Sequence, residues 1–128
     1  MIRWGVKFFS WVCADILRLD SEIRLERFYF WIDVCDELLT LNNLDSISAI
    51  ISAFNEPFIL RLKNTWNRIS PNSKLKFESF TNLFSPIRNY SNYREYFSKQ
   101  KFKPKIPAFI ILWNEIEELK KTNRWNNT

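Results

Sequence analysis

Hydrophobic residues recur at intervals of three and four along almost the whole chain, which is the spacing that places side chains on one face of an α-helix. In residues 2–18 the stripe is formed by Ile2, Val6, Phe9, Cys13 and Ile16. Six more segments with helical character follow, over residues 24–41, 44–54, 57–69, 74–84, 87–99 and 107–121. We therefore predict an all-α fold of about seven helices, packed as a largely orthogonal bundle with short corners.

Two of these segments carry the strongest signals of burial. Residues 24–41 have two hydrophobic stripes, one through Phe28 and one through Trp31, so this helix should run through the middle of the domain. Residues 44–54 are too apolar for a surface helix, and we expect the flanking helices to be arranged around them.

Asparagine residues mark both ends of the 44–54 helix. Asn42 can take the left-handed conformation that ends the preceding helix, and Asn43 can cap the next one. Asn55 stops that helix, and Pro57 suits the first turn of the following one.

Polar corners are predicted between the other helices. Ser21 is expected to cap the helix over residues 24–41. Residues 70–73 are expected to form a loop, because Pro71 disfavours helix at the residue before it. In the last helix, Phe109, Trp113 and Ile116 fall on one face.

The composition excludes several classes of function. The 128 residues suit one domain with a single modest core. With one glycine, a glycine-rich phosphate loop is not expected, and without histidine the commonest general base and metal ligand is missing. Two cysteines make a poor zinc site. We expect no catalytic, cofactor-binding or metal site.

Charge is distributed unevenly along the chain. Residues 1–60 carry 5 basic and 9 acidic side chains, whereas residues 61–128 carry 14 basic and 5 acidic ones. The basic half could meet an acidic protein, a membrane surface or nucleic acid. The lysine-rich residues 100–106 lack a nucleic-acid motif, so we interpret them as a solvated connector and expect no nucleic-acid partner.

The sequence also predicts a cytoplasmic location. It has no run of 18 apolar residues that could span a membrane. Its N-terminus imitates a signal peptide, but Asp15 interrupts the apolar run. Cys13 and Cys35 are expected to be reduced, buried thiols.

Several motifs resemble those of the catalytic domain of Ras-family guanine nucleotide exchange factors, the RasGEF domain. Residues 41–44 (LNNL), 49–52 (AIIS) and 61–66 (RLKNTW) are close to the family's LNNF, AIIS and RLKKTW, in the same order and without a gap. Residues 89–94 (NYSNYR) resemble the family's N-Y-x-N-Y-R, and residues 106–107 its I-P pair.

The resemblance implies a regulator that does no covalent chemistry. It would bind a Ras-like small GTPase at switch II, rearrange the switch regions and promote GDP release in small GTPase-mediated signal transduction. Such a protein needs no cofactor, and it can reach a membrane peripherally through its partner.

Matching positions imply which residues contact the GTPase: Ile2, Arg3, Ser48, Ser52 and Asn55. Ser48 stands where the family usually has a large apolar residue that lines a pocket for a switch II aromatic. Structural alternatives stay open, since Ile2 could belong to the core, Ser52 could bond back along its helix and Asn55 could act as a cap.

The resemblance covers nearly all of this chain but roughly the middle of the family's domain. We assign residues 1–122 to a partial RasGEF catalytic domain and residues 123–128 to a polar tail. The family's C-terminal helical hairpin, which opens the switch I side, lies beyond the matched region, and Leu112 stands where the family often has tyrosine. The alternative to an exchange factor is a binding-only scaffold with the same fold. A basic nucleic-acid or membrane-surface module ranks below both.

Overall fold

The computed structural model describes residues 2–17, 20–100 and 105–122, with side chains for all of these except residues 2–6, 21, 110, 115 and 122. Within these residues, the regular structure is helical apart from one isolated bridge, which confirms the all-α prediction. The helices are α1 (Ile2–Ile16), α2 (Ser21–Thr40), α3 (Leu44–Phe54), α4 (Pro57–Leu60), α5 (Lys63–Arg68), α6 (Pro71–Leu83), α7 (Ile87–Lys99) and α8 (Phe109–Thr122).

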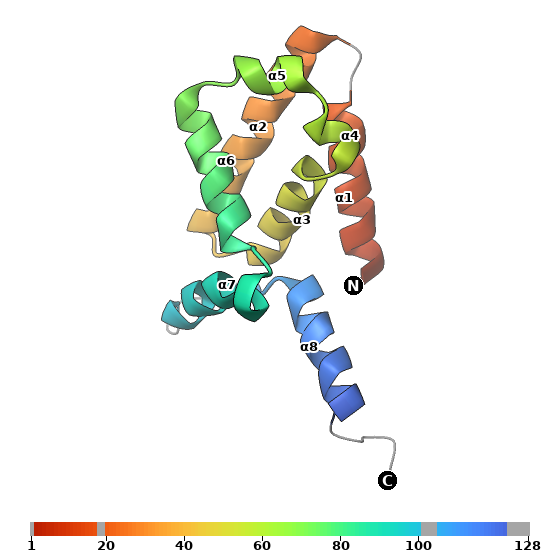
Figure 1. Cartoon of the computed structure of the whole chain (residues 1–128), viewed down its shortest axis with the longest axis vertical. Coiled ribbons are helices and arrows are strands. Elements are labelled where there is room, and N and C mark those ends of the chain that lie inside the picture. Colours follow the sequence, from red (N-terminus) through yellow and green to blue (C-terminus); the bar gives the residue numbers. More distant parts are fainter. Residues whose placement is uncertain (1, 18–19, 101–104, 123–128) are drawn as a thin grey trace.

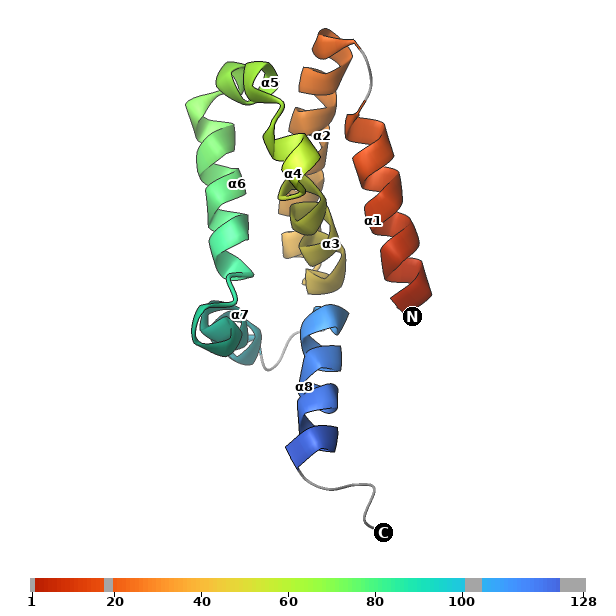
Figure 2. The same ribbon diagram turned by 45° about the vertical axis from the view of Figure 1, so that its right-hand side comes forward.

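Helix α3 lies at the centre of the molecule, with α1 on one side, α6 on the other and α2 behind it (Figure 1). Helix α7 crosses the lower end of this bundle, and α8 extends away from it (Figures 1 and 2). Among the described helices, none combines the length and the hydrophobicity that a membrane span requires.

The degree of burial separates α3 from α2. Seven of the 11 residues of α3 are buried, as the sequence predicts for a helix surrounded by others. Helix α2 contacts α1, α3, α5 and α6, yet Ile23 and Phe30 on its outer side are exposed. Helix α3 is thus the more completely surrounded of the two. Both predicted stripes of α2 nevertheless reach the core, through Phe28 and Trp31, so the prediction that this helix is buried on more than one side is confirmed.

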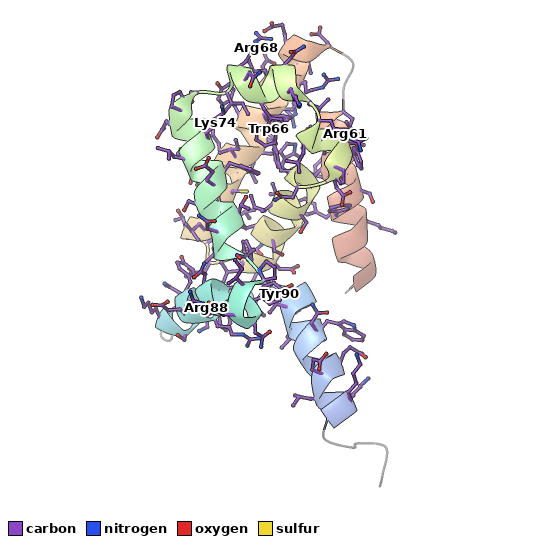
Figure 3. The ribbon with its side chains drawn as sticks, in the orientation of Figure 1. Arg61, Trp66, Arg68, Lys74, Arg88 and Tyr90 are labelled. Atoms are coloured by element: carbon purple, nitrogen blue, oxygen red, sulfur yellow. The ribbon has the colours of Figure 1, made fainter. Side chains whose placement is uncertain are left out.

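Four aromatic rings from four helices form the centre of the core. Phe28 of α2 lies edge-on to Phe54 of α3 at 5.1 Å and to Trp66 of α5 at 4.9 Å between ring centroids. Phe77 of α6 lies 5.7 Å from Phe54 and 4.9 Å from Trp66. Such pairs contribute about 0.5–1.5 kcal/mol each beyond the burial of their area. In Figure 3, Trp66 points from α5 into the bundle.

The predicted helix over residues 57–69 is two helices, so the described part of the chain forms eight helices where the sequence suggested about seven. Leu62 has φ −76° and ψ 62°, and the Lys63 amide donates to the Arg61 carbonyl at 2.7 Å. These values define an inverse γ-turn, which breaks the helix. The turn lets the Trp66 indole donate to the Ile59 carbonyl at 3.0 Å.

Two helix starts differ from the prediction. The cap of α2 is Asp20 and not Ser21, because an Asp20 carboxylate oxygen accepts from the Glu22 amide at 2.8 Å. The predicted loop over residues 70–73 is instead the start of α6, with Pro71 as its first residue. Ser70 caps this helix, and proline is well suited to a first turn because the missing N–H would have no helical partner there.

Helix α7 begins with an irregular turn. Arg88, Asn89 and Tyr90 all have left-handed backbone angles, with φ of 54°, 55° and 60°. This conformation costs a non-glycine residue about 1–2 kcal/mol. Beyond this turn the helix is right-handed, and Tyr93 is buried with Tyr90 and Phe97 half-buried beside it, as the spacing predicts.

A buried carboxylate fastens α1 to α2. One Asp15 oxygen accepts from Arg27 Nε at 2.6 Å and from the Trp31 indole at 2.8 Å. The sequence marks Asp15 only as an interruption of an apolar run. Its partners lie 12 and 16 residues away, so local periodicity does not reveal them.

Candidate partner-binding surface

The corner between α2 and α3 is built as the asparagines predict. Asn42 has φ 56°, and its amide and that of Asn43 donate to the carbonyls of Leu39 and Leu38. This pair of bonds is the Schellman arrangement that ends a helix at a left-handed residue. Asn43 then caps α3, accepting from the Ser46 amide at 3.2 Å.

The segment before α8 pairs with this corner. The Leu44 amide donates to the Ile106 carbonyl at 2.9 Å, and the Ile106 amide donates to the Asn42 carbonyl at 2.8 Å. These bonds form the isolated parallel bridge between Asn43 and Ile106. The LNNL and I-P motifs, 62 residues apart in the sequence at Leu44 and Ile106, are therefore in direct contact.

Three predicted site residues lie on one stripe of α3, at spacings of four and three. We call Ser48, Ser52 and Asn55 the α3 stripe. Ser48 is buried, and its hydroxyl donates to the Asp45 carbonyl at 2.7 Å. The back-bonding considered for Ser52 is thus found at Ser48. Ser52 and Asn55 are exposed.

Asn55 does cap its helix. Its side-chain amide donates to the Ile51 carbonyl at 2.8 Å, and its backbone amide also bonds to the last turn of α3. Within the described part of the chain, its side-chain oxygen has no hydrogen-bond partner. The capping role therefore leaves one acceptor open to solvent, which is compatible with a partner contact.

The remaining predicted residues, Ile2 and Arg3, belong to the first turn of α1, but their side chains lie outside the described residues. Helix α1 packs along α3, and its N-terminal end lies at the end of the bundle where α8 begins (Figures 1 and 2). Asn55 is at the opposite end of α3, which spans about 16 Å. The structure therefore brings Ser52 and Asn55 together, and places Ile2 and Arg3 toward the other end of the same helix pair.

Helix α8 carries several exposed apolar side chains. Trp113, predicted to share a face with Phe109 and Ile116, is 42% exposed, with Lys120 Nζ 5.9 Å from its ring centre. Leu112 beside it is 39% exposed, whereas Ile111 is buried. Periodicity identifies a helix face but not which face a neighbour covers.

A shallow cleft of about 330 Å³ lies between the start of α7 and α8. Tyr90 and Arg94 line it from α7, and Ile111 and Asn114 line it from α8. Figure 3 shows Tyr90 beside the first turns of α8. The left-handed turn of α7 thus directs its aromatic side chain toward α8.

Both cysteine thiols of the chain are buried. Burial raises the pKa of Cys35 to about 12, and burial together with the charge of Glu56 raises the pKa of Cys13. Both thiols are therefore protonated and poorly nucleophilic at neutral pH. Over residues 2–17, 20–100 and 105–122, no three carboxylates or cysteines come close enough to hold a metal ion.

Comparison with known proteins agrees with the motifs. The sequence pattern of the RasGEF domain matches residues 1–127. Ras-specific guanine nucleotide-releasing factor RalGPS1 of Danio rerio is 33% identical over 132 residues, which cover 91% of this chain and 23% of that protein. Ras-specific guanine nucleotide-releasing factor RalGPS2 of Homo sapiens is 35% identical over 107 residues (83% and 18%). Ras guanine nucleotide exchange factor R of Dictyostelium discoideum is 33% identical over 111 residues (86% and 6%). This chain spans less than a quarter of the length of these relatives, and it belongs to the RasGEF domain family.

Proposed function

We propose that this chain binds a Ras-like small GTPase at its switch II region and promotes the release of GDP. The observation that carries this proposal is the pair of family motifs, LNNL and AIIS, which build a buried helix with an exposed edge at Ser52 and Asn55. The names of the matched relatives, guanine nucleotide-releasing and exchange factors, support the same activity.

Exchange of this kind requires differential binding and no covalent step. A protein that binds the nucleotide-free GTPase more tightly than the GDP-bound form shifts the equilibrium toward release. Equal affinity for the two forms would not shift this equilibrium. To move the ratio of nucleotide-free to GDP-bound GTPase from 1:99 to 99:1, the two binding free energies must differ by about 5.5 kcal/mol. The absence of histidine from the whole chain is compatible with this kind of activity.

We assign the contacts with the GTPase to two adjacent helices. On α3, Ser52 offers a hydroxyl and Asn55 an open amide oxygen. Ser48 is buried below them and would shape the floor of the contact. On α1, Ile2 and Arg3 would extend the contact toward α8, where Leu112 and Trp113 are exposed.

A fluorescent-GDP release assay tests this function. Purified chain should accelerate release from a Ras-like GTPase, and Asn55→Ala should slow the accelerated reaction about tenfold, because hydrogen bonds at a desolvated contact contribute about 1.5 kcal/mol. Glu26→Ala, at an exposed position on α2, is the matched control and should leave the rate unchanged. Binding without faster release would identify a binding-only scaffold, and no binding to either form would refute the proposal.

A further inference from the structure

The N-terminal ends of α3 and α8 meet at one carboxylate. Asp45 lies in the first turn of α3, and its Oδ1 accepts from the amide of Phe109, the first residue of α8, at 2.9 Å. The first amides of a helix have no partner within it, and they form its positive end. Asp45 therefore supplies an acceptor and a negative charge to two helix ends at once.

Other hydrogen bonds also hold the residues at the start of α8. The Tyr93 hydroxyl of α7 accepts from the Ala108 amide at 2.9 Å, and the bridge at Ile106 fixes the preceding residues. Ala108 and Ile111 are the buried side chains of this junction. Beyond them α8 extends away from the bundle (Figure 2). Several of the hydrogen bonds at this junction thus act on the residues that begin α8.

The position of Asp45 on α3 relates this junction to the proposed contact. Asp45 precedes Ser48 by three residues, so it continues the α3 stripe toward the N-terminal end of the helix. Its carbonyl also accepts the Ser48 hydroxyl. Helix α8 thus begins at the foot of the α3 stripe, and Leu112 lies one turn further along it.

We propose that Asp45 is a positioning residue, which holds α8 in a fixed direction at the foot of the α3 stripe so that α3 and α8 meet the GTPase as one rigid surface. This inference rests on the proposed function for the partner, but the fixed direction of α8 is a property of the free chain. It assigns to Asp45 no contact with the GTPase itself.

The acceptor matters more than the charge in this role. Burial raises the pKa of Asp45, while the Phe109 amide acts in the opposite direction. Asparagine keeps an oxygen at the same place without a buried charge, so Asp45→Asn should preserve the junction. Asp45→Ala removes the acceptor, so the Phe109 amide at the start of α8 loses this hydrogen bond.

Distances between spin labels test the position of α8 in the free chain. Labels at Glu37→Cys on α2 and Lys121→Cys on α8 occupy exposed positions, whereas Cys13 and Cys35 are buried. The parent and Asp45→Asn should give one narrow distance distribution, and Asp45→Ala a distribution at least twice as broad. Equal widths in the parent and Asp45→Ala, or equal broadening in Asp45→Asn and Asp45→Ala, would overturn the proposal.

A second variant keeps the test decisive if Asp45→Ala fails to fold. Asp45→Ser retains a residue that suits a helix start, but its hydroxyl is one atom too short to take the place of the carboxylate oxygen. It should broaden the distribution as alanine does. A narrow distribution in Asp45→Ser would contradict the role of the acceptor.

Binding to the nucleotide-free GTPase then connects the junction to function. Asp45→Ala should weaken this binding about tenfold, whereas Asp45→Asn should bind as tightly as the parent. The helical circular dichroism signal should be the same in all three, which shows that the variants are folded. If the parent binds no GTPase, the proposed function fails and the label distances still decide the position of α8. If the parent binds and Asp45→Ala binds equally well, the positioning role is wrong and the proposed function stands.

Discussion

The two ends of this molecule are held together by different means. Around α3, four aromatic rings from α2, α3, α5 and α6 form five contacts with centroid distances of 4.9–6.0 Å. At the α7–α8 end, a left-handed turn and hydrogen bonds to Asp45 and Tyr93 act together with the buried side chains of Tyr93, Ala108 and Ile111. The aromatic rings thus fix the α3 stripe from three sides, and in our proposal Asp45 fixes the direction of α8.

The largest change in stability is expected from a substitution in the aromatic core. Phe54→Ala removes a side chain that is 1% exposed and contacts rings from three other helices, so it should lower the free energy of unfolding by about 3–5 kcal/mol. Urea denaturation followed by circular dichroism measures this. The control Leu75→Ala, at a residue that is 65% exposed on α6, should change the free energy by less than about 0.5 kcal/mol. Similar losses in both variants would contradict the assigned core.

A smaller loss of stability is expected at the polar cluster that joins α1 to α2. Asp15→Ala leaves Arg27 and the Trp31 indole without their shared acceptor, and should lower the free energy of unfolding by about 2–3 kcal/mol. Lys76→Ala breaks an ion pair with Asp36 in which both side chains are exposed, and should cost at most about 1 kcal/mol. Thermal unfolding of both variants measures the difference. Equal decreases in melting temperature would show that the Asp15 cluster does not stabilise the contact between α1 and α2.

At the left-handed turn of α7 we expect a substitution that raises the free energy of unfolding. Arg88→Gly should stabilise the chain by about 0.5–1 kcal/mol, because glycine adopts positive φ without the cost that other residues bear. Ser98→Gly, in the right-handed part of the same helix, should destabilise it by about 0.5–1 kcal/mol. Chemical denaturation of the two variants compares them, and destabilisation by both would mean that residue 88 is not left-handed.

These differences also explain what the sequence could and could not predict. The corner at Asn42 and Asn43 was predictable, because both residues act through their own backbone and side chains. The break at Leu62 was not, since it depends on Trp66 reaching the Ile59 carbonyl. The left-handed turn of α7 was not predictable either, because it contains no glycine, the residue that usually marks positive φ.

The proposed site residues could be placed only in part. The motifs point to Ser52 and Asn55, and the structure shows that both are exposed. The exposed Trp113 and the link from Asp45 to Phe109 depend on how α8 leaves the bundle. Residues 64 apart in the sequence carry no local signal of such a contact.

The smallest predicted effect is a dependence of stability on pH. Because burial raises the pKa of Asp45 in the folded chain, folding favours its protonated form. Its contribution to stability is therefore complete below the unfolded pKa of about 3.9 and is lost as the pH rises through the higher folded value. Melting temperatures of the parent and Asp45→Asn should diverge over this range, with the parent losing stability relative to the variant. A constant difference would contradict the raised pKa.

We propose that the α3 stripe and the first turn of α1 bind a GTPase without its nucleotide more tightly than one loaded with GDP. The most direct measurement is calorimetric titration of the purified chain with one Ras-like GTPase, first nucleotide-free and then loaded with GDP. We expect at least about tenfold tighter binding of the nucleotide-free form, and a smaller ratio of the two affinities for Asn55→Ala. Equal affinity for the two forms would contradict it, because such binding cannot promote release.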